Sequence, residues 1–178
     1  MHDLATPAPW SSSGGMDSGP QPADRGLYPD LAAALSGLLA GETDPVATAA
    51  NAAAAIFHTL GGLNWAGFYF LRDRELVVGP FQGRPACTRI PLGSGVCGTA
   101  AAHRRSILVP DVEAFPGHIA CDSASRSELV VPLMAGDALL GVLDLDSPHL
   151  ARFDAADQAG CEMLAAIVAR HLAPSMLE

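Results

Sequence analysis

The chain has 178 residues, which is enough for one domain with a sizeable hydrophobic core. Apolar residues make up 49% of it, yet no apolar run reaches the roughly 18 residues that a membrane-spanning helix needs. The net charge of −9, with few and scattered Lys and Arg, argues against a nucleic-acid partner. Residues 1–21 show no secretory signal, so we expect a cytoplasmic protein without a membrane partner.

The chain divides into a tail and one domain. Residues 1–25 are rich in Pro, Gly and Ser, which predicts a flexible tail, and residues 26–178 are expected to form a single domain. Apolar periodicity and capping residues predict a helix over 28–41 and a second helix from a cap at Thr43 or Asp44 to about Leu60. Strands over 65–71 and 75–79, a loop over 80–85, a short strand over 87–90 and a helix over 96–103 are expected next. Strands over 107–109, 128–134 and 138–146 and a final helix capped by Asp154 complete the predicted order.

Mostly antiparallel strands between terminal helices predict an α+β fold. In such a fold the terminal helices pack on one face of a central sheet. The other face is left to loops, and we expect a ligand pocket under those loops.

Three acidic residues fall on the predicted hairpin near the C-terminus. Asp144 and Asp146 are two positions apart, so they share a face of an otherwise apolar strand. Such acids are costly unless they are hydrogen-bonded or meet a cation, although an edge strand could leave them in water. A three-residue loop at 135–137 would place Glu128 opposite Asp144, whereas a two-residue turn at 136–137 would turn Glu128 to the other face. We expect the three-residue loop.

Two aromatic residues share a face of the strand over 65–71. Trp65 and Tyr69 both alternate with Ala66, Phe68 and Phe70, so they point the same way. Most aromatic residues of strands belong to the core. If their face is the ligand face, the two rings offer an aromatic wall to an apolar or softly charged group.

The chain contains four cysteines, Cys87, Cys97, Cys121 and Cys161. In a reducing compartment we do not expect structural disulfides between them. Their spacings of 10, 24 and 40 include no C-x-x-C pair, so a metal cluster, with His103 or His118, is the less favoured alternative. Cys161 falls on the apolar face of the final helix and is expected in the core. The other three could form a system in which one thiol is oxidised and another resolves it.

Cys121 lies in a polar, turn-rich segment over 115–128 that begins with Pro116 and Gly117. A cysteine in a loop is more accessible to a small molecule than one on an apolar helix face. His118 and Asp122 are near in sequence and bring charge and proton donors to the sulfur. The alternative is a surface loop with an incidental thiol.

Residues 93–98, GSGVCG, match the pattern G-x-G-x-x-G of dinucleotide-binding loops. A dinucleotide site also needs a buried strand before the loop and a following strand in a βαβ unit. The strand before Gly93 is short and polar, so the glycines more simply indicate a tight turn at a helix start.

The chain resembles the free methionine-(R)-sulfoxide reductases, which are built on the GAF-domain fold. The resemblance covers residues 27–172, and its most specific stretch is 115–122. It rests on the segments NWAGFY at 64–69, GPFQGRPAC at 79–87, GVCG at 95–98, FPGHIACD at 115–122, SELVVP at 127–132 and DLDS at 144–147.

This resemblance implies a function and a set of roles. Cys121 would attack the sulfur of free methionine (R)-sulfoxide and become a sulfenic acid, and Cys87 would resolve it as a disulfide that thioredoxin reduces. Cys97 would be a third family cysteine and a possible alternative resolver. The resemblance further implies a homodimer, and it implies neither a cofactor nor a metal.

The resemblance also implies how the substrate is held. The substrate ammonium would be held by Glu128, Asp144 and Asp146, and Trp65 and Tyr69 would shape the pocket around the methyl-sulfoxide end. The runner-up is a non-catalytic GAF sensor that binds a small metabolite or nucleotide and needs no thiols.

Overall fold

The computed structural model describes residues 27–119 and 122–177, so the predicted tail and Cys121 lie outside the described residues. The described elements follow the order α1 (Leu27–Leu38), α2 (Pro45–Thr59), β1 (Trp65–Arg72), β2 (Glu75–Gly83), β3 (Arg89–Pro91), α3 (Gly95–His103), β4 (Ile107–Val109), a 3-10 turn (Val112–Ala114), β5 (Ser127–Ala135), β6 (Ala138–Ser147) and α4 (Ala155–Met176). The strands form one antiparallel sheet in the order β3-β2-β1-β6-β5-β4. The predicted α+β class is therefore confirmed.

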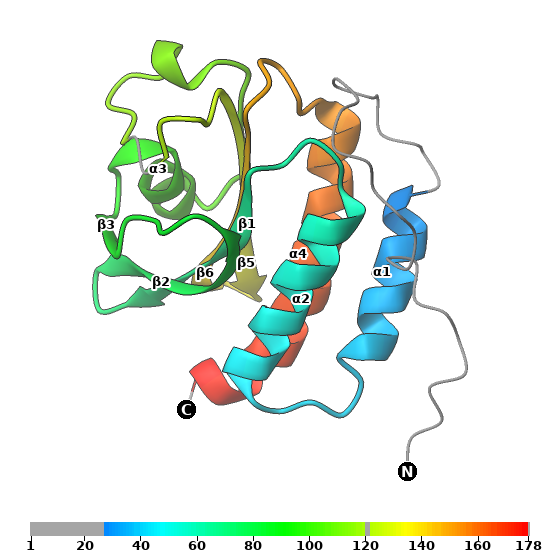
Figure 1. Cartoon of the computed structure of the whole chain (residues 1–178). Helices are drawn as coiled ribbons and strands as arrows, with labels where there is room; N and C mark the ends of the chain where they lie inside the picture. Colours follow the sequence, from blue (N-terminus) through cyan, green and yellow to red (C-terminus); the bar gives the residue numbers. More distant parts are fainter. Residues whose placement is uncertain (1–26, 120–121, 178) are drawn as a thin grey trace.

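The helices α2 and α4 cover one face of the sheet, and α1 packs against them on the side away from the strands, so the helices gather on one face as predicted (Figure 1). Asp44 caps α2 by accepting hydrogen bonds from the main-chain N–H groups of Val46 and Ala47, and Asp154 and Asp157 form a capping box at the start of α4. Small alanine side chains on the buried side of α2 let that helix pack closely against the sheet.

The opposite face of the sheet carries a smaller core under α3 and the loops (Figure 1). Trp65 and Tyr69 of β1 point to this face, while Phe68 and Phe70 point to the helical face, which confirms the predicted alternation. Buried Val130 of β5 and Val142 of β6 belong to the same smaller core. Of the helices in the described ranges, none combines the length and hydropathy that a membrane crossing requires.

The turn of the β5–β6 hairpin differs from the predicted one. Ala135 pairs with Ala138, so the turn consists of only Gly136 and Asp137. Gly136 takes a positive φ of 58°, which glycine adopts without strain. A two-residue turn followed by an unbroken ladder would direct Glu128 to the helical face.

A β-bulge reverses that consequence. The register shifts between Leu133 and Met134, and this irregularity pairs Glu128 with Asp146. The predicted pairing of Glu128 with Asp144 is therefore wrong. The prediction that all three acids share one face is right, because the bulge restores the parity that the shorter turn removes.

Two strand boundaries also differ from the predicted ones. β2 continues to Gly83, so most of the predicted loop over 80–85 is strand. Pro80 has no N–H for the ladder, and it is tolerated because the pairing with β1 is already irregular between Gly67 and Tyr69. β3 begins only at Arg89, so Cys87 lies in the connection between β2 and β3 and not in a strand.

Candidate active site

The glycine-rich segment forms a tight turn that starts α3. Gly93 and Gly95 take positive φ values of 83° and 60°, and the N–H of Gly93 donates to the carbonyl of Gly98 at 2.8 Å. A side chain at Gly98 would collide with the carbonyl oxygen of Pro91. The strands that flank α3 in sequence, β3 and β4, lie at opposite edges of the sheet, so they form no βαβ unit.

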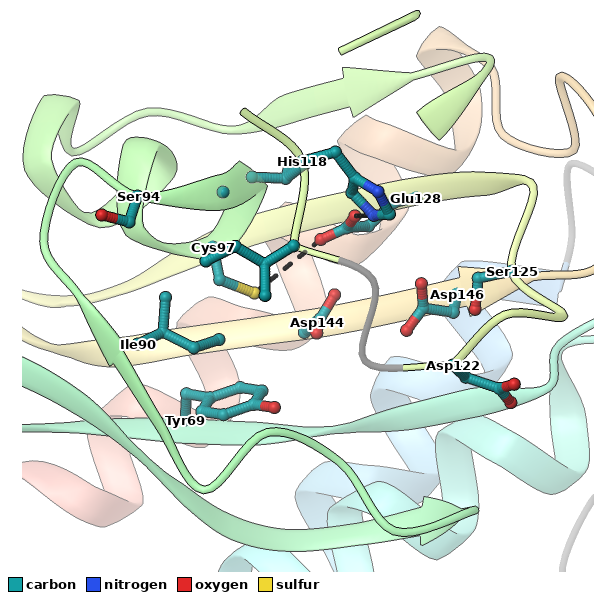
Figure 2. A pocket seen from close by; sticks show the side chains of 13 residues that line it. Tyr69, Ile90, Ser94, Cys97, His118, Asp122, Ser125, Glu128, Asp144 and Asp146 are labelled. Carbon is teal, nitrogen blue, oxygen red and sulfur yellow. Dashed lines mark hydrogen bonds and ion pairs between the residues drawn. The ribbon is translucent and has the colours of Figure 1, made fainter. Parts of the chain in front are cut away.

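A small cavity opens between the start of α3, the face of β5 and β6, and residues 118–119 and 122–125 (Figure 2). Glu128, Asp144 and Asp146 all line it, together with Tyr69 and Cys97. Five of the predicted site residues thus meet in one cavity. A pocket on the loop face of the sheet is what the sequence predicted.

The three acids of this cavity are strongly desolvated. Glu128 and Asp144 are each 6% exposed, and Oδ1 of Asp144 has no hydrogen-bond partner within the described part of the chain. Burial raises the pKa of Asp144 from 3.8 to about 6, although hydrogen bonds from Cys97 and Glu128 partly offset it. Burial, and then repulsion from the other acids, also raise the pKa of Glu128 and of Asp146.

Cys97 stands beside these acids on the first turn of α3. Its Sγ donates to Oε1 of Glu128 at 3.8 Å (Figure 2). Burial, and repulsion from Asp144 and Glu128, raise the pKa of this thiol well above its ordinary value. A thiol held protonated in this way is a hydrogen-bond donor to the acids and a weak nucleophile.

Cys97, Glu128 and Asp144 also satisfy the geometry of a metal-binding group. One donor atom from each lies within 4.8 Å of the others, and all three residues are buried. One thiolate and two carboxylates form a donor set that a divalent ion such as Zn²⁺ accepts. The expectation that the protein works without a metal therefore stays a prediction.

Asn64, before β1, and Ser125, before β5, join Asp122 in a hydrogen-bond network that the sequence did not predict. Nδ2 of Asn64 donates to Oδ2 of Asp122 at 3.2 Å and to Oγ of Ser125 at 3.0 Å. A hydrogen bond from Ser125 in turn lowers the pKa of Asp146 against the effect of burial. These groups are about 60 positions apart in the chain, and no local pattern links them.

His118 lines the cavity next to Glu128. Its Nε2 lies 3.8 Å from Oε2 of Glu128 (Figure 2). Burial lowers the pKa of His118, which favours the neutral imidazole at neutral pH. The sequence indicated a proton donor near Cys121, and the structure places His118 beside the buried acids.

The remaining predicted site residues lie around this cavity. Trp65 lines an adjoining hollow, together with Tyr69, Pro85, Asp144 and Asp146. Cys87 is half-buried in the β2–β3 connection, and Tyr69 donates a hydrogen bond to its carbonyl oxygen at 3.0 Å. Cys121 lies outside the described residues, but its neighbours Ile119 and Asp122 line the cavity.

Cys161 lies on the helical side of the sheet, far from this cavity in the fold. It is fully buried in the larger core, where its Sγ lies 4.0 Å from the hydroxyl of Tyr28. The prediction that Cys161 is a core residue is confirmed.

Comparison with known proteins agrees with this geometry. A family model described as the GAF domain matches residues 42–173. The free methionine-R-sulfoxide reductase of Escherichia coli is 49% identical over 147 residues, which cover 83% of this chain and 89% of the relative. The chain belongs to the free methionine-R-sulfoxide reductases.

Solved structures of similar proteins share the GAF fold with this reductase. The Neisseria meningitidis enzyme, crystallised with its substrate, is 46% identical at a TM-score of 0.82 and covers 87% of this chain and 94% of its own. A structure described as a candidate GAF sensor protein from Burkholderia vietnamiensis is 54% identical at a TM-score of 0.83, covering 88% of this chain and all of its own. The resemblance predicted from the sequence is confirmed.

Proposed function

We propose that the protein reduces free methionine (R)-sulfoxide to methionine by thiol chemistry. The Cys121 thiolate attacks the sulfoxide sulfur, the S–O bond of the substrate breaks, and the oxygen takes up one proton and ends on Cys121 as a sulfenic acid while methionine leaves. The Cys87 thiol then attacks the sulfenyl sulfur, so that an S–S bond forms and the oxygen leaves as water. The dithiol of thioredoxin reduces this disulfide and becomes a disulfide itself, which supplies the two electrons of the reaction.

The observation that carries the proposal is the unpaired carboxylate oxygen of Asp144 inside the cavity. A buried carboxylate oxygen without a partner is costly, and a substrate ammonium would supply both a positive charge and the missing donor. Glu128 and Asp146 flank Asp144 and would share that ammonium. A free amino acid carries such an ammonium, whereas a methionine residue within a peptide chain does not.

Thioredoxin-coupled oxidation of NADPH tests the proposal. We expect consumption with free methionine (R)-sulfoxide and at least about 100-fold less with the N-acetylated compound, because acetylation removes the ammonium. Cys121→Ser should abolish the activity. Cys161→Ser is the matched control, because it removes a thiol on the helical side of the sheet and should leave the activity intact. Turnover by Cys121→Ser at the wild-type rate would contradict the attacking role of Cys121.

The resolving role is proposed for Cys87 and not for Cys97. Cys97 is fully buried and its raised pKa disfavours the thiolate, whereas Cys87 is half-buried on a loop. With thioredoxin as the reductant, we expect Cys87→Ser to release about one methionine per enzyme molecule, after which turnover should stop. Full steady-state activity of Cys87→Ser would assign the step to Cys97.

A non-catalytic sensor is the second candidate, favoured by the description of the Burkholderia vietnamiensis protein. A sensor would bind a small ligand in the same cavity without consuming NADPH. Thermal-shift binding of methionine sulfoxide without turnover, in a protein whose thiols are reduced, would favour it.

The proposal also includes a cytoplasmic homodimer that needs no cofactor or resident metal. Terminal helices are common dimer contacts in GAF proteins, and α1 and α4 pack side by side on the helical face (Figure 1). Light scattering during gel filtration would report the dimer mass. Elemental analysis of the purified protein should find less than about one tenth of an equivalent of zinc at the buried donor set.

A further inference from the structure

The connection that carries Cys87 is a short loop over residues 84–88, and side chains of β1 hold its main chain. Nε1 of Trp65 donates to the carbonyl oxygen of Arg84 at 3.2 Å, and the hydroxyl of Tyr69 donates to the carbonyl oxygen of Cys87 at 3.0 Å. A third carbonyl, that of Thr88, accepts from the main-chain N–H of Val78 at 3.0 Å. Cys87 is disulfide-bonded in this structure, so two aromatic side chains fasten the loop to the sheet in the bonded form.

The two donors are themselves rigidly placed. The ring of Trp65 stacks on Phe81 at 5.2 Å and on Tyr69 at 5.8 Å. Gly67 lies between Trp65 and Tyr69 on β1, and a side chain there would collide with Phe81 and with the Trp65 ring. The missing side chain lets the rings lie flat across the strand, so that the indole N–H and the phenol O–H face the loop.

Both side chains are almost completely buried, Trp65 at 2% and Tyr69 at 1% exposure. Burial, and repulsion from Asp144, raise the pKa of Tyr69 well above its ordinary value, so the hydroxyl stays a donor at every working pH. A buried donor that loses its acceptor pays the cost of desolvation, so the loop conformation that supplies the carbonyl is favoured.

We propose that Tyr69 and Trp65 are positioning residues for the resolving step, and that they hold the Cys87 loop against the cavity while its thiol attacks. This inference rests on the proposed function, in which the Cys87 sulfur displaces the oxygen of the sulfenic acid and water leaves. Without the two hydrogen bonds, the loop would sample more conformations before the S–S bond forms. The aromatic pair then serves recycling as well as the shape of the pocket.

Tyr69→Phe tests the inference because it removes only the hydroxyl and keeps the ring of the pocket wall. Pre-reduced enzyme is mixed with free methionine (R)-sulfoxide in a rapid-quench experiment without thioredoxin. Methionine release reports the first step, and loss of two thiols reports disulfide formation. We expect disulfide formation to slow about tenfold and methionine release to slow clearly less, by about threefold or under. Trp65→Phe, which removes the indole N–H, should likewise slow disulfide formation more than methionine release.

The matched control is Tyr28→Phe. It removes a buried hydroxyl hydrogen bond of the same kind, from Tyr28 to Asp157 at 2.6 Å, on the opposite side of the sheet. Tyr28→Phe should leave the ratio of the rate of disulfide formation to the rate of methionine release unchanged. Equal slowing of both steps in Tyr69→Phe, or an unchanged rate of disulfide formation, would overturn the inference and leave Tyr69 with a pocket role alone.

A measurement that needs no activity separates this inference from the proposed function. In the reduced protein, peptide mass mapping follows the rate at which iodoacetamide alkylates Cys87. Release of the loop in Tyr69→Phe should raise that rate several-fold over wild type and over Tyr28→Phe. An unchanged rate would overturn the anchoring, even in an active enzyme. A wild-type protein that forms no methionine would contradict the proposed function, while the alkylation result would still decide the anchoring.

Discussion

The two faces of the sheet treat buried charge in opposite ways. On the helical face the carboxylate of Asp157 is 1% exposed and fully partnered: it accepts from the hydroxyl of Tyr28 at 2.6 Å, from Nη1 of Arg152 at 3.2 Å and from the N–H of Asp154 at 3.0 Å. On the loop face Asp144 is equally enclosed, yet one of its oxygens has no partner among the described residues and its neighbours are other acids.

We interpret this difference as one between a structural charge and a charge arranged for the proposed substrate. A carboxylate with a cation and two further donors is satisfied by the fold and needs nothing else. A carboxylate crowded by like charges is an unfavourable arrangement, which the ammonium of the proposed substrate would relieve. The sheet between the two faces supplies the rigidity that both arrangements need.

The largest effect is expected where the satisfied charge is broken. Arg152 is 7% exposed, and besides Asp157 it donates from Nε to the carbonyl of Gly61 at 2.9 Å. Arg152→Met should lower the free energy of unfolding by about 3–5 kcal/mol, because it leaves the buried carboxylate of Asp157 without its cation. Urea denaturation measures the loss.

The matched control for Arg152→Met is Arg89→Met. Arg89 forms a shorter ion pair with Glu75, at 2.6 Å, but both side chains are substantially exposed. Its loss should cost no more than about 1 kcal/mol. Similar losses in the two variants would show that burial does not distinguish the helical-face network from a surface pair.

Asp144→Asn tests the other face of the comparison. Asparagine has the same shape as aspartate but no charge for the substrate ammonium, so kcat/KM for free methionine (R)-sulfoxide should fall at least about 100-fold. The free energy of unfolding should stay the same or rise, because a repelled buried charge is removed. Asp157→Asn, the same change on the helical face, should instead destabilise the protein. A kcat/KM of Asp144→Asn close to wild type would show that Asp144 does not hold the substrate.

The sequence predicted the elements of this comparison better than their connections. Local signals such as the cap at Asp44, the capping box of α4 and the alternation along β1 are set by neighbouring residues, and they proved right. The order of elements along the chain and the shared face of Asp144 and Asp146 also followed from periodicity.

The details that were missed depend on residues far apart in the chain. The bulge in the β5–β6 hairpin changes which residue Glu128 faces, and a turn sequence alone does not encode it. The network of Asn64, Asp122 and Ser125 forms only when β1 and the loop before β5 meet. Likewise, the hydrogen bond from Tyr69 to the Cys87 carbonyl required the path of a loop that the strand pattern placed differently.

The smallest expected effect is a dependence of stability on pH that belongs to the loop face alone. Burial raises the pKa of Asp144 from 3.8 to about 6, so between these pH values the native state binds more protons than the unfolded state. Stability contributed by this group is therefore present at low pH and is lost as the pH rises through about 6. Subtracting the unfolding free energy of Asp144→Asn from that of wild type isolates the group from the other acids.

That difference should fall by about 1 kcal/mol between pH 5 and pH 7. Over the same range KM for the free sulfoxide should decrease, because only the ionised carboxylate attracts the ammonium. Stability and substrate binding would then change in opposite directions with one titration, as expected for a charge that the fold tolerates and the ligand completes. A difference for Asp144→Asn that stays flat or rises from pH 5 to pH 7 would show that this carboxylate is not held at a cost, and the contrast between the two faces would lose its energetic basis.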